Sequence, residues 1–142
     1  MNEMSNDAAT EIDALTLAVV RQKLLTVSEE IVETMVRTCF SPLLNQSRDL
    51  SAVVLDGEAQ VVAQAERTPI HMGAMPFAVR AMAEDFHGRV GPNDVIMAND
   101  PYWGGSHLPD ITLVKPVFRD NQLRFWVAIR AHQSDTGGIS AG

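Results

Sequence analysis

Two long strand-like runs near the end of the sequence constrain the fold more than any other feature. Residues 111–118 read ITLVKPVF, residues 123–132 read LRFWVAIRAH, and the polar stretch RDNQ joins them. Runs rich in β-branched and aromatic residues on both sides of a short turn are typical of a β-hairpin. We therefore predict an antiparallel hairpin that turns at residues 120–121 and pairs Phe118 with Leu123.

The open end of this hairpin carries one short motif twice. Residues 107–110 read HLPD and residues 132–135 read HQSD, so in each a histidine precedes an aspartate by three positions. Neighbouring strands lie about 4.8 Å apart, which brings residues distant in sequence together. The side chains expected to cluster there are His107, Asp110, His132 and Asp135.

The register of the hairpin decides which of these side chains meet. The predicted turn places Asp110 opposite Ala131, and Pro109 then lies opposite His132. Side chains alternate between the two faces of a strand. One face of the second run carries Leu123, Phe125, Val127 and Ile129, and the other carries Arg124, Trp126, Arg130 and His132. His132 is thus expected to point away from the most apolar face, and a shift of one residue would reverse this arrangement.

His107, Asp110 and His132 supply two imidazoles and one carboxylate. Such a set of three ligands leaves positions open on a divalent ion for water or substrate. An ion held there can polarise a carbonyl group and lower the pKa of bound water. Asp135 is then a fourth ligand, an acceptor that orients an imidazole, or a proton acceptor. The alternative is that these residues form turns beside proline and glycine, and spacing alone does not separate the two interpretations.

Two other segments contribute candidate site residues. Asp100 and Tyr102, in the NDPYWGG loop, are candidates for substrate binding, with an ordinary Asx turn as the alternative for Asp100. His71, in PIHMG, is a candidate catalytic residue that handles a proton in the same cleft. The alternative for His71 is a loop histidine whose hydrogen bonds are satisfied locally.

A long amphipathic helix is predicted near the N-terminus. Apolar residues recur at helical spacing from Asp13 to Cys39, and Asp13 or Thr10 can cap the start. Ser41-Pro42 ends this helix, since proline removes a backbone donor and restricts the residue before it. Cys39 is the only cysteine, so no internal disulfide is possible, and we expect it to be a small buried residue.

The middle of the chain predicts shorter elements. LSAVVLD and AQVVAQA flank Asp56-Gly57 as the two strands of another hairpin, and VIMAND is a short strand. Residues 74–87 form a second helix that Gly88 ends. The order predicts an α+β fold in which a long N-terminal helix, antiparallel β-hairpins and a second helix form part of a larger domain.

Composition excludes several classes of protein. With 142 residues, 46% of them hydrophobic, the chain suits one soluble domain with a modest core. The formal charge of −7 argues against nucleic acid or an anionic membrane as a partner. Neither a signal peptide nor a membrane span is visible, so a cytoplasmic location is expected. Residues 1–12 are expected to be flexible, and residues 13–142, which stop in the glycine-rich SDTGGISAG, to be the truncated N-terminal portion of a domain.

Three segments are distinctive when taken together: SRDLSAVVLDGEAQVVAQAERTPIHMGAMPFAVR, NDPYWGGSHLPDITLVKPVF and RAHQSDTGG. They resemble the hydantoinase B/oxoprolinase family. This family includes the B subunits of N-methylhydantoinases and is related to subunits of acetone and acetophenone carboxylases. The two H-x-x-D blocks in order make the resemblance specific.

The resemblance implies a division of labour between subunits. A hydantoinase A-like partner would bind ATP and activate the substrate, which agrees with the lack of a familiar nucleotide-binding motif here. This chain would belong to a B-type component of a hetero-oligomer that hydrolyses a cyclic amide such as a hydantoin or 5-oxoproline. His107, Asp110 and His132 match the ligand positions for manganese or zinc. The alternatives are a subunit of an ATP-dependent ketone carboxylase and a non-catalytic binding or assembly domain.

Overall fold

The predicted hairpin forms the middle of a β-sheet. In the computed structural model of the chain, which describes residues 12–65 and 67–139, strands β4 (Asp110–Arg119) and β5 (Gln122–His132) pair antiparallel. Asp120 and Asn121 connect them with positive φ angles of 53° and 57°. Two successive residues of this conformation make the tight turn whose twist matches that of the flanking strands. The hairpin and the position of its turn are confirmed.

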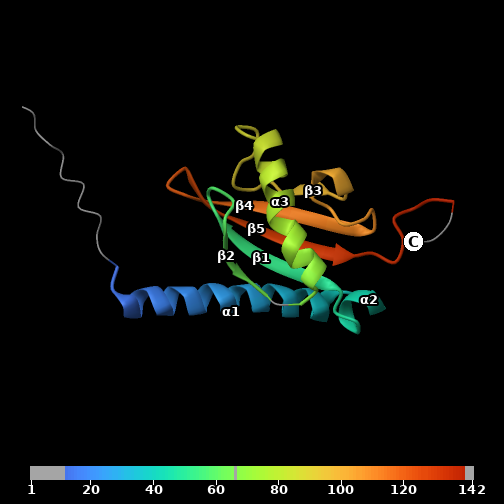
Figure 1. Cartoon of the computed structure of the whole chain (residues 1–142), viewed down its shortest axis with the longest axis horizontal. Coiled ribbons are helices and arrows are strands. Elements are labelled where there is room, and N and C mark those ends of the chain that lie inside the picture. Colours follow the sequence, from blue (N-terminus) through green and yellow to red (C-terminus); the bar gives the residue numbers. More distant parts are fainter. Residues whose placement is uncertain (1–11, 66, 140–142) are drawn as a thin grey trace, which may run out of the picture.

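In the described part of the chain, five strands form one sheet in the order β2-β1-β5-β4-β3, and all neighbours are antiparallel. The three further strands are β1 (Leu50–Asp56), β2 (Val61–Gln64) and β3 (Ile96–Ala98). Figure 1 shows helix α3 (Pro69–Asp85) crossing the sheet and helix α1 (Ala14–Thr38) running alongside it. The predicted α+β class, with a long first helix, antiparallel hairpins and another helix, is confirmed.

The predicted register of β4 and β5 holds only beside the turn. Phe118 pairs with Leu123 as predicted, but a β-bulge follows, and Val117 pairs with Phe125. Arg124 is the additional residue on β5, and it moves every later pair by one position. Asp110 therefore lies directly opposite His132, and the predicted pairing of Asp110 with Ala131 is wrong.

The bulge also changes which side chains share a face. Leu123 packs against the same core as Trp126 and Ala128, beneath α3, whereas Ile129 packs against the core beside α1. The predicted face that joins Leu123 with Ile129 is therefore wrong. The face of β5 that carries Trp126 and Arg130 is also the more deeply buried one, because α3 covers it.

Helix α3 starts five residues before the predicted residue 74. Pro69 stands in its first turn, where a missing N–H costs nothing and the fixed φ angle suits a helix. Met75, Val79 and Met82 pack from this helix onto the sheet. The early start brings His71 into the first turn of the helix.

Helix α1 begins where predicted, because the Asp13 side chain accepts a hydrogen bond of 2.9 Å from the Thr16 N–H. The alternative cap, Thr10, lies outside the described residues, as does almost all of the segment expected to be flexible. Val32 is fully buried, but Leu17 near the start of α1 is 59% exposed, so the apolar stripe is covered only in part. Cys39 is half-buried at the end of the helix, less than expected.

The first hairpin, between β1 and β2, is confirmed, but its turn is longer than the predicted Asp56-Gly57. Residues 57–60 separate the strands, and the positive φ angle lies at Ala59 (57°). Asp56 holds the loop, since its Oδ1 accepts hydrogen bonds from the N–H groups of Glu58 and Gln60.

Within the described residues, no helix has the length and apolar character required to cross a membrane. The cytoplasmic location stays a prediction.

Candidate metal centre

Three donor atoms converge at the open end of the β4–β5 hairpin. Asp110 is the first residue of β4, His132 is the last of β5, and His107 stands on the loop before β4. His132 Nδ1 lies 3.0 Å from Asp110 Oδ1 and 3.2 Å from His107 Nε2. His107 Nε2 lies 3.1 Å from the same carboxylate oxygen. The structure thus brings the three predicted ligands together.

These spacings fit a divalent ion. Ligand atoms held at about 2.0–2.2 Å from one ion, as N and O donors of zinc are, stand roughly 3.0–3.5 Å apart, depending on the angle between the bonds. The two imidazole rings stack with centroids 4.8 Å apart, and each still has one nitrogen within 3.1 Å of Asp110 Oδ1. No other group of three or more such side chains with donors this close occurs in the described parts of the chain. The chemistry and the spacing of the donors match the predicted ligand set.

Asp110 is the buried centre of this cluster. Its side chain is fully buried, whereas the side chain of His107 is 50% exposed. Its other oxygen, Oδ2, accepts a hydrogen bond from the Ser106 hydroxyl. Burial acts most strongly and would raise the pKa of Asp110, but the hydrogen bonds from Ser106 and His132 and the nearby His71 keep it below its ordinary value. Asp110 therefore stays a carboxylate, the form that binds a cation.

His71 reaches the same carboxylate from α3. Its side chain is 2% exposed, and its Nε2 lies 3.2 Å from Asp110 Oδ2. The Asp49 carboxylate lies 3.9 Å from Nε2, and the Ser51 hydroxyl lies 3.5 Å from Nδ1. Burial lowers the pKa of His71, and the charges of Asp110 and Asp49 oppose that effect only in part. A neutral His71 can donate from Nε2 to Asp110 and accept at Nδ1 from Ser51.

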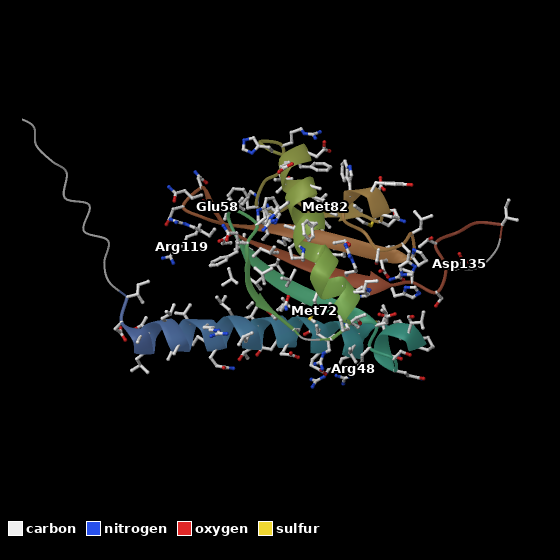
Figure 2. All side chains as sticks on the ribbon, in the orientation of Figure 1. Arg48, Glu58, Met72, Met82, Arg119 and Asp135 are labelled. Atoms are coloured by element: carbon white, nitrogen blue, oxygen red, sulfur yellow. The ribbon has the colours of Figure 1, made fainter. Side chains whose placement is uncertain are left out.

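The other three predicted site residues do not contact the three donors. Asp100 accepts a hydrogen bond from the Tyr102 N–H at 2.8 Å, and the Tyr102 side chain is 96% exposed. Asp135 accepts a hydrogen bond from the Gly137 N–H at 2.8 Å. Figure 2 shows Asp135 on the segment that follows β5. Asp100 and Asp135 thus take part in local turns, which is the alternative that the sequence left open for each.

The structure adds residues that sequence reasoning missed. Asp49 and Ser51 join the site because β1 lies beside β5, and the Asp49 carbonyl accepts a hydrogen bond of 3.1 Å from the His132 N–H. Ser106 precedes a predicted ligand, and a serine next to a candidate ligand could have been considered. Arg130 lies two residues before His132 on the same strand, so its side chain is expected on the same face as that of His132. That it is fully buried could not be read from the sequence.

Comparison with known proteins points to one family. The model of a family described as Hydantoinase B/oxoprolinase matches residues 13–142. A 5-oxoprolinase from Pestalotiopsis fici, PfmaA, is 37% identical over 131 residues, which are 92% of this chain and 10% of that protein. The caprolactamase subunit beta of Pseudomonas jessenii is 36% identical over 132 residues, covering 92% of this chain and 23% of the subunit.

Solved structures show the same fold. The crystal structure of the ATP-dependent caprolactamase from Pseudomonas jessenii superposes with a TM-score of 0.85 and 35% identity, over 92% of this chain and 22% of that one. A nucleotide-free acetone carboxylase superposes with a TM-score of 0.77 and 25% identity, over 88% of this chain and 17% of the other. The chain therefore spans less than a quarter of each of these relatives.

Proposed function

This chain belongs to the hydantoinase B/oxoprolinase family, and from that premise we propose that it is the metal-holding part of a B-type component that hydrolyses cyclic amides. Its substrate would be a hydantoin or a lactam such as 5-oxoproline, activated with ATP by a partner subunit. The relatives that carry this proposal are named as a 5-oxoprolinase and as a subunit of caprolactamase.

The observation that supports this proposal most is the convergence of His107, Asp110 and His132 within 3.0–3.2 Å of one another. A manganese or zinc ion held there would act as a Lewis acid toward the carbonyl group of the activated amide. Asp110 supplies the negative charge of the set, and its burial keeps solvent away from that charge. The half-exposed His107 leaves the cluster open on the side from which a substrate would approach.

His71 would control the proton beside the metal ligands. Its Nε2 faces the second oxygen of Asp110, and its burial keeps the imidazole neutral. We assign it the role of holding a proton at Nε2, which orients the Asp110 carboxylate toward the other two donors. Asp135 remains a candidate for proton transfer from the segment after β5.

Asp100 and Tyr102 would meet the substrate at the rim. Asp100 caps the short helix η1 (Pro101–Trp103), and the Tyr102 side chain on this helix is 96% exposed. A phenol exposed in this way can contact the substrate or the neighbouring subunit. A Tyr102→Ala variant with an altered KM and an unchanged metal content would support the first of these roles.

ATP would be bound by the partner. Two relatives are ATP-dependent by name, one is called a beta subunit, and this sequence carries no familiar nucleotide-binding motif. We therefore expect a hetero-oligomer with a hydantoinase A-like subunit. Residues 13–142 would form the N-terminal portion of the B-type component.

The test uses the whole protein together with its ATP-binding partner. ATP-dependent release of the ring-opened product from hydantoin and 5-oxoproline would be measured for the wild type and for His132→Ala. His87→Ala is the matched control, because His87 is exposed and lies beyond the end of α3. We expect His132→Ala to lose bound metal and most turnover and His87→Ala to keep both. Normal turnover and metal content in His132→Ala would refute the assignment.

Carboxylation of an ATP-activated ketone is a second candidate, favoured by the structural likeness to acetone carboxylase. The same preparation would be given acetone, ATP and labelled bicarbonate. Label in a stable carboxylate product would identify a carboxylase, whereas unlabelled ring-opened product from a cyclic amide would identify a hydrolase. If the protein binds its partner but shows neither hydrolysis nor carboxylation and holds no metal, it would be a non-catalytic assembly domain.

A further inference from the structure

Arg130 is a buried guanidinium without a partner of opposite charge in direct contact. The residue is 0% exposed, and within the described residues it forms no ion pair, so the charge of Asp110 acts on it only from beyond 4.0 Å. Its Nε donates to the Thr112 hydroxyl at 2.8 Å, and its Nη2 donates to the Gly104 carbonyl at 2.9 Å. Burying a charge costs several kcal/mol unless its hydrogen bonds compensate. An arginine in this position therefore needs a reason beyond core packing.

Gly104 marks the point where the loop before β4 touches the rest of the fold. Its φ angle is +79°, and a Cβ atom there would lie 2.4 Å from the backbone nitrogen of Ala78 on α3. The loop backbone is thus pressed against α3 from one side. Arg130 holds the carbonyl of the same residue from the sheet below.

The loop that these contacts hold also carries His107. Asp110 and His132 belong to paired strands, so the sheet fixes their positions. His107 lies three residues after Gly104, and its side chain is half exposed. The loop backbone must therefore set the place of this third donor.

We propose that Arg130 is a positioning residue for the candidate metal centre, because it fixes the loop at Gly104 and so holds His107 at the distance that lets it share an ion with Asp110 and His132. This inference rests on the proposed function. The ligand concerned is a divalent cation.

Two possible roles of Arg130, through its position and through its charge, predict opposite effects on metal affinity when the residue is removed. A guanidinium repels a nearby cation, so a role through charge alone requires that removing Arg130 strengthens metal binding. A role through position requires that removing it weakens binding, because His107 is no longer held in place. The direction of the change in affinity therefore separates the two.

The experiment uses the whole protein of which this chain is a part, and it measures the affinity for Co²⁺ alone by calorimetry and the visible absorption of the bound ion. The variants are Arg130→Met, Arg130→Lys, His107→Ala and the double variant of Arg130→Met with His107→Ala. Arg124→Met is the matched control, since Arg124 is an exposed arginine on the same strand. Circular dichroism checks that each variant is folded.

We expect Arg130→Met to bind Co²⁺ about 10- to 100-fold more weakly than the wild type, the usual effect of losing a residue that supports a ligand. Its absorption spectrum should approach that of His107→Ala. The double variant should bind no more weakly than His107→Ala alone, since both changes remove the same ligand. Arg130→Lys should also weaken binding, because lysine keeps the charge but cannot bond to Thr112 and the Gly104 carbonyl at the same time in the way that arginine does. If Arg130→Met does not fold, Arg130→Lys takes its place in the test.

Other results would overturn the inference. Unchanged or tighter binding by Arg130→Met or Arg130→Lys would exclude a positioning role, as would full additivity of Arg130→Met with His107→Ala. If the wild type binds no Co²⁺, the metal centre itself is refuted, and this inference with it. Binding by the wild type that both arginine variants retain would refute only this inference.

Discussion

Replacing Asp110 with asparagine should remove metal binding while costing the fold little. Asparagine has the shape of aspartate, and its one carbonyl oxygen can still accept from Ser106 and His71 where Oδ2 now does. Its amide group would then face His107 and His132, whose ring nitrogens can accept hydrogen bonds. The metal-free variant can thus satisfy its buried polar groups. We expect the free energy of unfolding to fall by about 1–2 kcal/mol, because the hydrogen bonds at this position no longer involve a charged group.

The effect of metal on stability should be much larger. At a zinc concentration of about 100 times the dissociation constant, binding adds roughly 2.7 kcal/mol to the free energy of unfolding of the wild type. In a domain of this size, that is a rise in Tm of about 10 °C. A 100-fold weaker site, expected when the only anionic ligand is lost, would gain only about 0.4 kcal/mol at the same zinc concentration, or about 1–2 °C.

The assay is thermal unfolding followed by circular dichroism, with zinc and with a chelator, for the wild type and Asp110→Asn. Asp85→Asn is the control, because Asp85 is an exposed carboxylate at the end of α3. It should show the full rise in Tm on addition of zinc. An equal rise in Asp110→Asn would mean that the ion binds elsewhere, and the reasoning about this cluster would be wrong.

Two further predictions concern the metal-free chain. The free energy of unfolding should fall as the pH drops below about 6.5, because the pKa of His71 is lowered in the folded chain and the unfolded chain therefore binds the proton first. It should fall again below about 4, because the pKa of Asp110 is lowered in the same way. A free energy of unfolding that stays constant from pH 7 to pH 5 would contradict the first of these effects. In urea unfolding, Leu55→Ala should lower the free energy of unfolding by about 2–5 kcal/mol, since Leu55 is fully buried. Leu15 is 74% exposed, so Leu15→Ala should change it by no more than about 0.5 kcal/mol. Similar losses in the two variants would contradict the placement of the core.

Much of the fold could be predicted because its signals are local. The Asp13 cap sets the start of α1 through residues three positions away, and the tight turn at residues 120–121 needs only a short connection between two strand-forming runs. The start of α3 was predicted too late, because the apolar pattern is clearest after residue 74. The signal at Pro69 was present, since proline favours the first turn of a helix.

The identities of the candidate ligands could also be read from the sequence, since the repeated H-x-x-D motif stands at the ends of two adjacent strands. Their exact partners could not. The bulge at Arg124, which sets Asp110 opposite His132, depends on which side chains α3 and the sheet can bury together. No pattern within the hairpin itself indicates that shift.

The sequence by itself determined the elements, the chemistry of three donors and the family, because each depends on residues close together in the chain or on a motif as a whole. The tertiary structure decided the surroundings of those donors. It brought Asp49 beside His132 by placing β1 next to β5, put His71 against Asp110 by packing α3 on the sheet, and buried Arg130 beneath the loop of His107. These contacts join segments that are far apart in sequence, and the burial of apolar surface between the helices and the sheet selects them.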